Sequence, residues 1–124
     1  MKNLNVITEK IIACAIEVHR ELGPGLLESI YEKALCYELH QSNLQVKNQV
    51  LVPVIYKNLN INDNYKLDVL VENQIIIELK SITELLPIHH AQLLTYLKLT
   101  KKKLGLLINF NVPTLKDGIK RKIL

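Results

Sequence analysis

The spacing of apolar residues predicts two helices in the first third of the chain. Between residues 7 and 22 one helical stripe is formed by Ile7, Ile11, Ala15, Val18 and Leu22. The Gly-Pro-Gly segment at 23–25 predicts the end of this helix and a change of direction. A second helix is predicted over about 26–41, closed by Ser42 and Asn43. Its expected core side consists of Leu27, Ile30, Ala34 and Leu35.

The middle of the chain has the pattern of strands. Residues 45–57 form a strand pattern that contains Pro53, and a proline within a strand indicates an edge position or a bulge. The asparagine-rich segment 57–64 is predicted to be a connecting turn. Residues 65–80 then predict two strands, about 65–71 and 75–80, joined by a tight turn. Both arms are rich in Val, Ile and Leu, which is typical of strands covered on both faces.

The last third predicts a helix and two further strands. Pro87 is expected in the first turn of a helix that runs to about Leu99. The side chains expected to face the sheet are Ile88, Ala91, Leu94 and Leu97, and a polar stripe is expected from His89, Gln92 and Tyr96. A buried strand at 104–110 and a final edge strand in the tail follow. The resulting order, α-α-β-β-β-α-β-(β), predicts an α/β fold with a mixed sheet flanked by helices.

Length and composition place few limits on function. A chain of 124 residues is expected to form one domain over residues 1–124. The net charge of +4 permits binding to nucleic acid without requiring it. Cys14 and Cys36 lack metal-ligand spacing and are expected to be buried free thiols. These features, with no signal peptide and no membrane-spanning apolar run, favour a cytoplasmic location.

Three charged residues interrupt the apolar hairpin at 65–80. They are Asp68, Glu78 and Lys80, and buried charges are costly unless they are paired or bind a metal. A three-residue turn at 72–74 pairs Asp68 with Glu78, whereas a two-residue turn puts them on opposite faces. In the first register, the two carboxylates suit Mg²⁺ or Mn²⁺, with an ammonium group beside them. The alternative is a salt bridge at the edge of the sheet.

Other polar residues have two interpretations each. Glu28 lies in the first turn of the second helix, where an acid is favourable because of the helix dipole. Tyr31 follows one turn later and is expected to lie close to Glu28 on the helix surface. His19, near the end of the first helix, either approaches the same site or serves as a surface or cap residue. The pair His89-His90 is a poor metal site, because neighbouring residues point to different sides of a helix.

Four stretches of the chain carry a family resemblance. They are GLLESIY at 25–31, LDVLVENQIIIELK at 67–80, HHAQLLTYLKLT at 89–100 and KLGLLINFNV at 103–112. Together, and in this order, they resemble the GxxExxY family, which is grouped with the PD-(D/E)xK nuclease superfamily near its RecB-like branch. The resemblance extends from about His19 to Arg121 and implies a restriction-endonuclease-like fold.

The resemblance also implies roles for individual residues. Asp68 and Glu78 would be metal ligands, with the Leu79 carbonyl and Glu28 contributing, and Lys80 would be the catalytic lysine. Gln92 would belong to the catalytic set, with Tyr96 completing a Q-x-x-x-Y element. Tyr31 and Tyr96 would contact the substrate. Leu67 stands where the superfamily's name has proline, a position that varies widely.

The implied activity is Mg²⁺- or Mn²⁺-dependent hydrolysis of phosphodiester bonds, with DNA as the expected substrate. An alternative is a non-catalytic module that keeps the nuclease fold and binds nucleic acid or another protein. A further possibility is that activity requires a homodimer or a protein partner that helps to hold the substrate.

Overall fold

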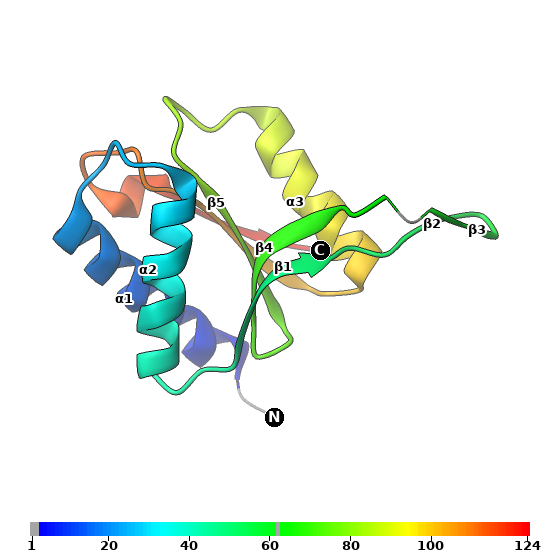
Figure 1. Ribbon diagram of the computed structural model, residues 1–124, viewed down its shortest axis with the longest axis horizontal. Coiled ribbons are helices and arrows are strands. Elements are labelled where there is room, and N and C mark those ends of the chain that lie inside the picture. Colours follow the sequence, from blue (N-terminus) through cyan, green and yellow to red (C-terminus); the bar gives the residue numbers. More distant parts are fainter. Residues whose placement is uncertain (1–2, 62) are drawn as a thin grey trace.

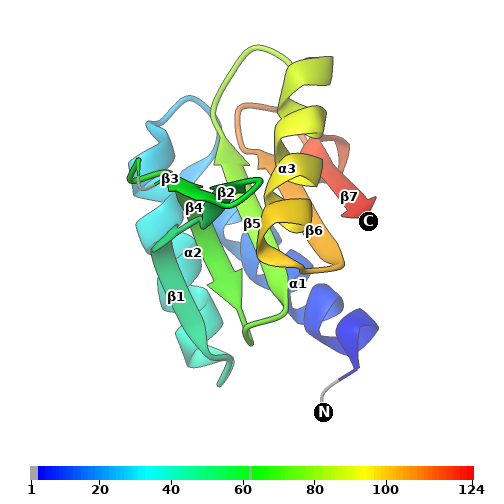
Figure 2. The same ribbon diagram turned by 90° about the vertical axis from the view of Figure 1, so that its right-hand side faces the viewer.

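A mixed β-sheet with helices on both faces forms the body of the molecule. The computed structural model describes residues 3–61 and 63–124. Helices α1 (Leu4–Leu22) and α2 (Glu28–Gln41) cover one face of the sheet, and α3 (Pro87–Thr100) covers the other (Figures 1 and 2). The predicted α/β architecture is therefore confirmed. None of the helices in the described residues is long and apolar enough to cross a membrane.

Helix α1 buries the side that its apolar spacing predicts. The buried members of the stripe are Ile7, Ile11, Ala15 and Val18. Leu22, at the end of the helix, is instead 40% exposed. Asn3 caps the start of the helix, because its side chain accepts a hydrogen bond from the backbone N–H of Asn5 at 2.8 Å.

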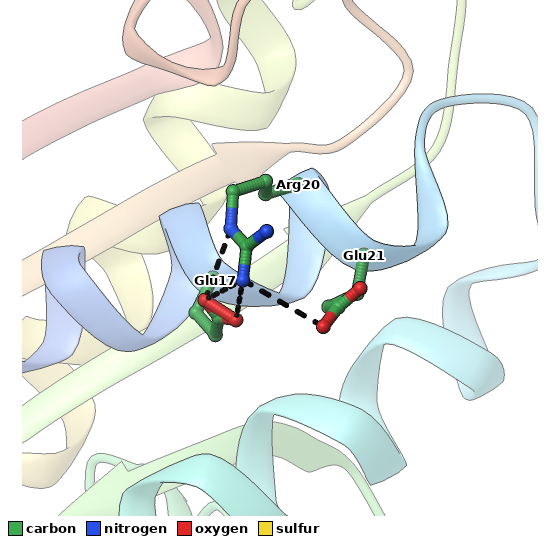
Figure 3. Close-up of polar contacts among 3 residues, drawn as sticks. All are labelled: Glu17, Arg20 and Glu21. Carbon is green, nitrogen blue, oxygen red and sulfur yellow. Dashed lines mark hydrogen bonds and ion pairs between the residues drawn. The ribbon is translucent and has the colours of Figure 1, made fainter.

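The outer side of α1 carries a small cluster of charges. Arg20 Nη2 lies 2.5 Å from Glu17 Oε1 and 3.6 Å from Glu21 Oε1 (Figure 3). All three side chains are exposed, and ion pairs at such positions contribute little to stability. The cluster therefore marks a solvated surface of the helix.

Helix α2 is rotated relative to the prediction. Leu27 and Ile30, expected in the core, are 74% and 42% exposed. The buried side chains of α2 are Tyr31, Leu35 and Leu39. The prediction that Tyr31 lies on the helix surface is therefore wrong. Its ring stacks on Phe110 with centroids 4.4 Å apart, which gives this larger side chain the buried position.

Five strands form the main sheet in the order β1-β4-β5-β6-β7. Their bounds are β1 (Val46–Leu51), β4 (Lys66–Val71), β5 (Ile75–Lys80), β6 (Leu104–Asn109) and β7 (Ile119–Ile123). Strands β5 and β6 run parallel, and the other neighbours run antiparallel. The sheet is thus mixed, and the predicted final edge strand is β7.

Strands β4 and β5 form the predicted hairpin with its three-residue turn. Val71 pairs with Ile75, so the register that puts Asp68 opposite Glu78 is adopted and the two-residue turn is excluded. Glu72 has a φ of 53° and Asn73 a φ of 55°, both in the left-handed region. Asparagine tolerates this conformation better than most residues.

The segment around Pro53 forms two strands where one was predicted. Strand β1 ends before Pro53 and lies at the edge of the sheet, as the proline indicates. Beyond it, β2 (Val54–Tyr56) pairs with β3 (Leu59–Ile61) in a separate hairpin that projects from the sheet (Figure 1). The prediction of an irregular turn over 57–64 is therefore wrong for residues 59–61. Residue 62 lies outside the described residues.

Helix α3 begins at Pro87 as predicted but presents a different side to the sheet. Of the residues expected to face the sheet, Leu97 is buried but Ile88 is 67% exposed, and the other buried side chains are Leu93 and Tyr96. Tyr96 therefore does not belong to an exposed polar stripe. Gly105 of β6 allows Leu93 of the helix to pack closely on the sheet, because a Cβ atom at this position would lie 2.8 Å from Leu93 Cδ1.

The two cysteines are free thiols. Cys14 is buried, as expected, and its sulfur lies 3.3 Å from Ser42 Oγ. Cys36 is only half-buried, so the expectation of burial holds for one of the two.

Candidate functional site

Two carboxylates occupy the point where strands β4 and β5 separate. Regular pairing of these strands extends from Val71 and Ile75 as far as Val69 and Ile77. Beyond it, the backbone N–H of Asp68 donates to Glu78 Oε1 at 3.1 Å, and the backbone N–H of Leu79 donates to Asp68 Oδ2 at 2.8 Å. Each carboxylate thus accepts a backbone hydrogen bond from the opposite strand. These bonds hold the two side chains together at the opening between the strands.

Burial and a neighbouring negative charge perturb the Glu78 carboxyl group. Glu78 is 5% exposed, and burial raises its pKa to about 8, with the negative charge of Asp68 as the next cause. A hydrogen bond between the two side chains also raises this pKa, whereas the Asp68 backbone N–H and the positive charge of Lys80 lower it. At neutral pH the buried Glu78 carboxyl group therefore favours its protonated form.

Lys80 lies on the same side of the sheet as Glu78. Ile77 and Leu79 of β5 pack in the core beneath α1 and α2, whereas Ile76 packs beneath α3. Because side chains alternate along a strand, Glu78 and Lys80 both belong to the α3 side. The structure thus brings Asp68, Glu78 and Lys80 together, as the hairpin register predicts.

Gln49 and Glu32 complete the surroundings of Asp68. Gln49 lies within β1 but has a φ of 53°, which is unusual for a non-glycine residue in a strand. Its side-chain Nε2 donates to Glu32 Oε1 at 2.8 Å and lies 3.5 Å from Asp68 Oδ1. This amide therefore links α2 to the carboxylate pair. Sequence reasoning missed both residues; for Glu32 a signal existed, because it lies one helical turn after Glu28.

Glu28 reaches a neighbouring part of the site. Its Oε2 accepts a hydrogen bond from the backbone N–H of Ser81 at 3.3 Å, directly after Lys80. Across residues 3–61 and 63–124, no three His, Cys, Asp or Glu side chains form a group that could hold a metal ion. The structure therefore brings Asp68 and Glu78 together but does not bring Glu28 into one ligand set with them.

Tyr31 holds the loop between α1 and α2. Its side chain is fully buried, and its hydroxyl donates to the Gly23 carbonyl at 2.6 Å and accepts from the Leu26 N–H at 3.1 Å. Gly23 itself has a φ of 71°, in the region that favours glycine. The tyrosine thus fixes the chain just before Glu28 and has no accessible surface for contact with a substrate.

Replacing Tyr31 with Phe is expected to lower the free energy of unfolding by about 1–2 kcal/mol, because the two partly buried hydrogen bonds of the Tyr31 hydroxyl are lost. Urea denaturation followed by circular dichroism measures this change. Tyr37→Phe is the matched control, since Tyr37 lies on the same helix and is 61% exposed. Equal stability of the Tyr31 variant and wild type would show that these bonds do not hold the loop.

A second aromatic cluster connects α3 to the carboxylate pair. The rings of Tyr65 and Tyr96 meet edge-to-face with centroids 5.4 Å apart, and Gln92 Nε2 donates to the Tyr65 hydroxyl at 3.3 Å. Hydrogen bonds with Tyr96 and Gln92 lower the pKa of Tyr65. Burial, followed by the hydrogen bond to Tyr65 and the charge of Glu78, raises the pKa of Tyr96. Gln92 and Tyr96 therefore contribute to one polar cluster beside Glu78.

Two of the histidines form hydrogen bonds with the backbone of other residues. His19 Nε2 lies 2.8 Å from the Val112 carbonyl oxygen and joins α1 to the loop after β6. His89 Nδ1 accepts a hydrogen bond from the Leu86 N–H at 2.9 Å and thereby caps the start of α3. Burial lowers the pKa of His90, and the positive charges of Lys122 and Lys120 lower it further.

Comparison with known protein families places the chain in a superfamily. The family model of the PD-(D/E)XK nuclease superfamily matches residues 5–122. The chain therefore belongs to this superfamily, and its mixed sheet flanked by helices is a restriction-endonuclease-like fold. No curated protein and no solved structure matches the chain.

The carboxylate pair fits the chemistry of this superfamily, whose members generally use divalent metal ions. A buried carboxyl group that favours its protonated form, as Glu78 does, can exchange the proton for a cation. Carboxylate oxygens are also the ligands that Mg²⁺ and Mn²⁺ prefer. Asp68 and Glu78 place two carboxylate groups side by side.

Proposed function

We propose that the protein is a metal-dependent nuclease that hydrolyses phosphodiester bonds in nucleic acid, with DNA as the expected substrate. The pairing of Asp68 with Glu78 at the opening between β4 and β5 is the observation that carries the proposal. Glu78 is buried beside a second carboxylate and its pKa is raised, which is an unfavourable arrangement unless a cation compensates it. Its placement within a nuclease fold supports a catalytic role.

Asp68 and Glu78 would hold Mg²⁺ or Mn²⁺, which supplies Lewis-acid activation of water and of the phosphate. Lys80, on the same side of the sheet, orients the attacking water and stabilises negative charge that develops on the phosphate. Gln49 orients Asp68 through its amide, with Glu32 holding that amide in turn.

The remaining predicted residues act indirectly in this proposal. Glu28 fixes the Ser81 backbone and so positions the end of β5 that carries Lys80. Gln92 and Tyr96 hold Tyr65 beside the carboxylate pair. Tyr31 fixes the loop from which Glu28 emerges.

We also propose that the chain belongs to the GxxExxY family, near the RecB-like branch of the superfamily. Gly25, Glu28 and Tyr31 supply the G-x-x-E-x-x-Y pattern, and the contacts of Glu28 and Tyr31 give two of these positions a structural role. Gln92 and Tyr96 match the Q-x-x-x-Y element in sequence and lie beside Glu78.

Cleavage assays test the proposed activity directly. Purified protein is incubated with plasmid DNA, single-stranded DNA and RNA in the presence of Mg²⁺, Mn²⁺ or EDTA. Cleavage is expected with the metals and not with EDTA. Lys80→Ala is expected to lower the rate by about a hundredfold to a thousandfold, the usual effect of removing one group that stabilises transition-state charge.

Lys10→Ala is the control variant for this assay. Lys10 is exposed on α1, on the opposite side of the sheet, and its loss is expected to leave the rate unchanged. Absence of cleavage by the wild-type protein under all these conditions, together with retained binding to nucleic acid, would favour the non-catalytic module instead.

A further inference from the structure

A mainly apolar groove of about 530 Å³ lies between α3 and the β2–β3 hairpin. Val54 and Ile61 line it from the hairpin, and Ile88 and Leu99 line it from the helix. Its volume is in the range of pockets that bind small organic groups. Ile88 is 67% exposed and Ile61 38%, so the described structure leaves this apolar surface open to solvent.

Two aromatic residues connect the groove with the neighbourhood of the carboxylate pair. Tyr65 and Tyr96 belong to the groove lining, and the charge of Glu78 acts on both phenol groups. The charge of Lys80 also acts on Tyr65. A molecule that occupies the groove therefore contacts two aromatic side chains on which the charge of Glu78 acts. The occupant is most simply a part of the substrate itself.

The charge of the lining indicates which part of a nucleic acid fits. Among the described residues that line the groove, Asp63 is the charged one, and it is acidic. A phosphate would be repelled there, whereas an uncharged base is not. The half-exposed ring of Tyr65 offers a stacking surface, and the side chains of Gln92 and Thr95 offer hydrogen bonds to a base edge.

We propose that this groove receives unpaired nucleobases of a single-stranded nucleic acid and thereby sets the adjoining phosphodiester beside Asp68 and Glu78. This inference rests on the proposed nuclease function and specifies its substrate class. In a duplex, base faces are stacked and paired, so they reach such a groove only after unpairing, which costs a few kcal/mol. A strand that is already single avoids that cost.

Binding without cleavage tests the proposal separately from catalysis. Fluorescence anisotropy in EDTA compares three labelled strands of equal length and phosphate number: oligothymidylate, oligouridylate and an abasic DNA strand. At least one base-bearing strand is expected to bind about tenfold more tightly than the abasic strand, since stacking of one base on an aromatic side chain has an effect of this order. A duplex of the same length is not expected to bind more tightly than the abasic strand.

Ile88→Glu is the test variant, because it places a carboxylate in the groove at an exposed position near the start of α3. It is expected to abolish the preference for the base-bearing strand over the abasic strand. Ile123→Glu is the matched control: Ile123 is also 67% exposed but lies on β7, and the preference is expected to persist.

Two results would overturn the inference: equal binding of base-bearing and abasic strands by the wild-type protein, or an unchanged preference in Ile88→Glu. If only oligothymidylate or only oligouridylate binds more tightly than the abasic strand, the inference is supported, and the result shows whether the groove prefers DNA or RNA. Failure of cleavage in Mg²⁺ or Mn²⁺ concerns the proposed nuclease activity, because these binding measurements contain no metal.

Discussion

Replacing Asp68 with Asn is expected to lower the rate of metal-dependent cleavage by about a thousandfold or more while the fold is retained. The substitution keeps a side-chain oxygen that can accept the hydrogen bond from the Leu79 N–H, so the strand geometry survives. It removes one of the two negative charges that would hold the cation. A loss of about 4 kcal/mol in stabilisation of the transition state corresponds to about a thousandfold in rate.

Two measurements on Asp68→Asn separate metal binding from chemistry. Calorimetric titration with Mn²⁺ is expected to show binding to wild type and at least tenfold weaker binding to the variant, and the cleavage assay then gives the rate at saturating metal. Asp117→Asn is the control, since Asp117 is exposed in the short helix η1 (Leu115–Gly118). If Asp68→Asn binds Mn²⁺ and cleaves as wild type does, the carboxylate pair is not the metal centre.

The central hairpin could be predicted from the sequence because its local geometry has few solutions. Side chains alternate with a period of two, so a turn of three residues between Val71 and Ile75 fixes which side chains face each other. Asn73 in the turn accommodates a positive φ, which favours the observed length. From that register alone, Asp68 and Glu78 have to meet.

The rotation of the helices could not be predicted in the same way. Helix α3 has apolar residues on most of its sides, so periodicity does not decide whether Ile88 or Leu93 faces the sheet. The absence of a side chain at Gly105, on the strand that follows the helix, leaves the space that Leu93 occupies. In α2, the acceptor at Gly23 and the ring of Phe110 bury Tyr31, and these contacts join segments that are separate in sequence.

The contacts of the site residues outside the hairpin also could not be predicted, because they depend on how the elements pack together. Glu28 was expected among the metal ligands, and the structure instead gives it the backbone of Ser81 as its partner. Gln49 carries no sequence signal, because its left-handed backbone within β1 and the contacts of its side chain with Glu32 and Asp68 exist only in the folded structure. Sequence patterns place residues on elements, whereas distances between elements depend on packing.

The stability of the metal-free protein is expected to fall as pH rises, because Glu78 loses its proton in a buried site. The pKa of this carboxyl group rises from 4.5 to about 8 on folding. Between these values the folded chain binds more protons than the unfolded chain, so the free energy of unfolding decreases with increasing pH. The stabilisation is complete below pH 4.5 and is lost as the pH passes through about 8.

Urea denaturation in EDTA between pH 5 and pH 8 measures this effect. Wild type is expected to lose about 3 kcal/mol of unfolding free energy over this range from Glu78 alone, since each pKa unit corresponds to about 1.4 kcal/mol. In Glu78→Gln, which does not ionise, this part of the slope is expected to disappear. Glu9→Gln, at an exposed position on α1, is the control that should keep it. The histidines contribute equally to the pH dependence of wild type and Glu78→Gln, so the difference between the two unfolding free energies removes their contribution.

Addition of Mn²⁺ at pH 8 connects this behaviour to the proposed activity. A cation that binds the ionised carboxylates stabilises the folded state. This stabilisation grows with the logarithm of the ratio of the cation concentration to its dissociation constant. Wild type should therefore recover stability at pH 8, whereas Glu78→Gln should recover little. A wild-type slope that matches that of Glu78→Gln would show that Glu78 ionises as easily in the folded chain as in the unfolded chain. In that case the two carboxylates would not form the tightly coupled pair on which metal binding depends.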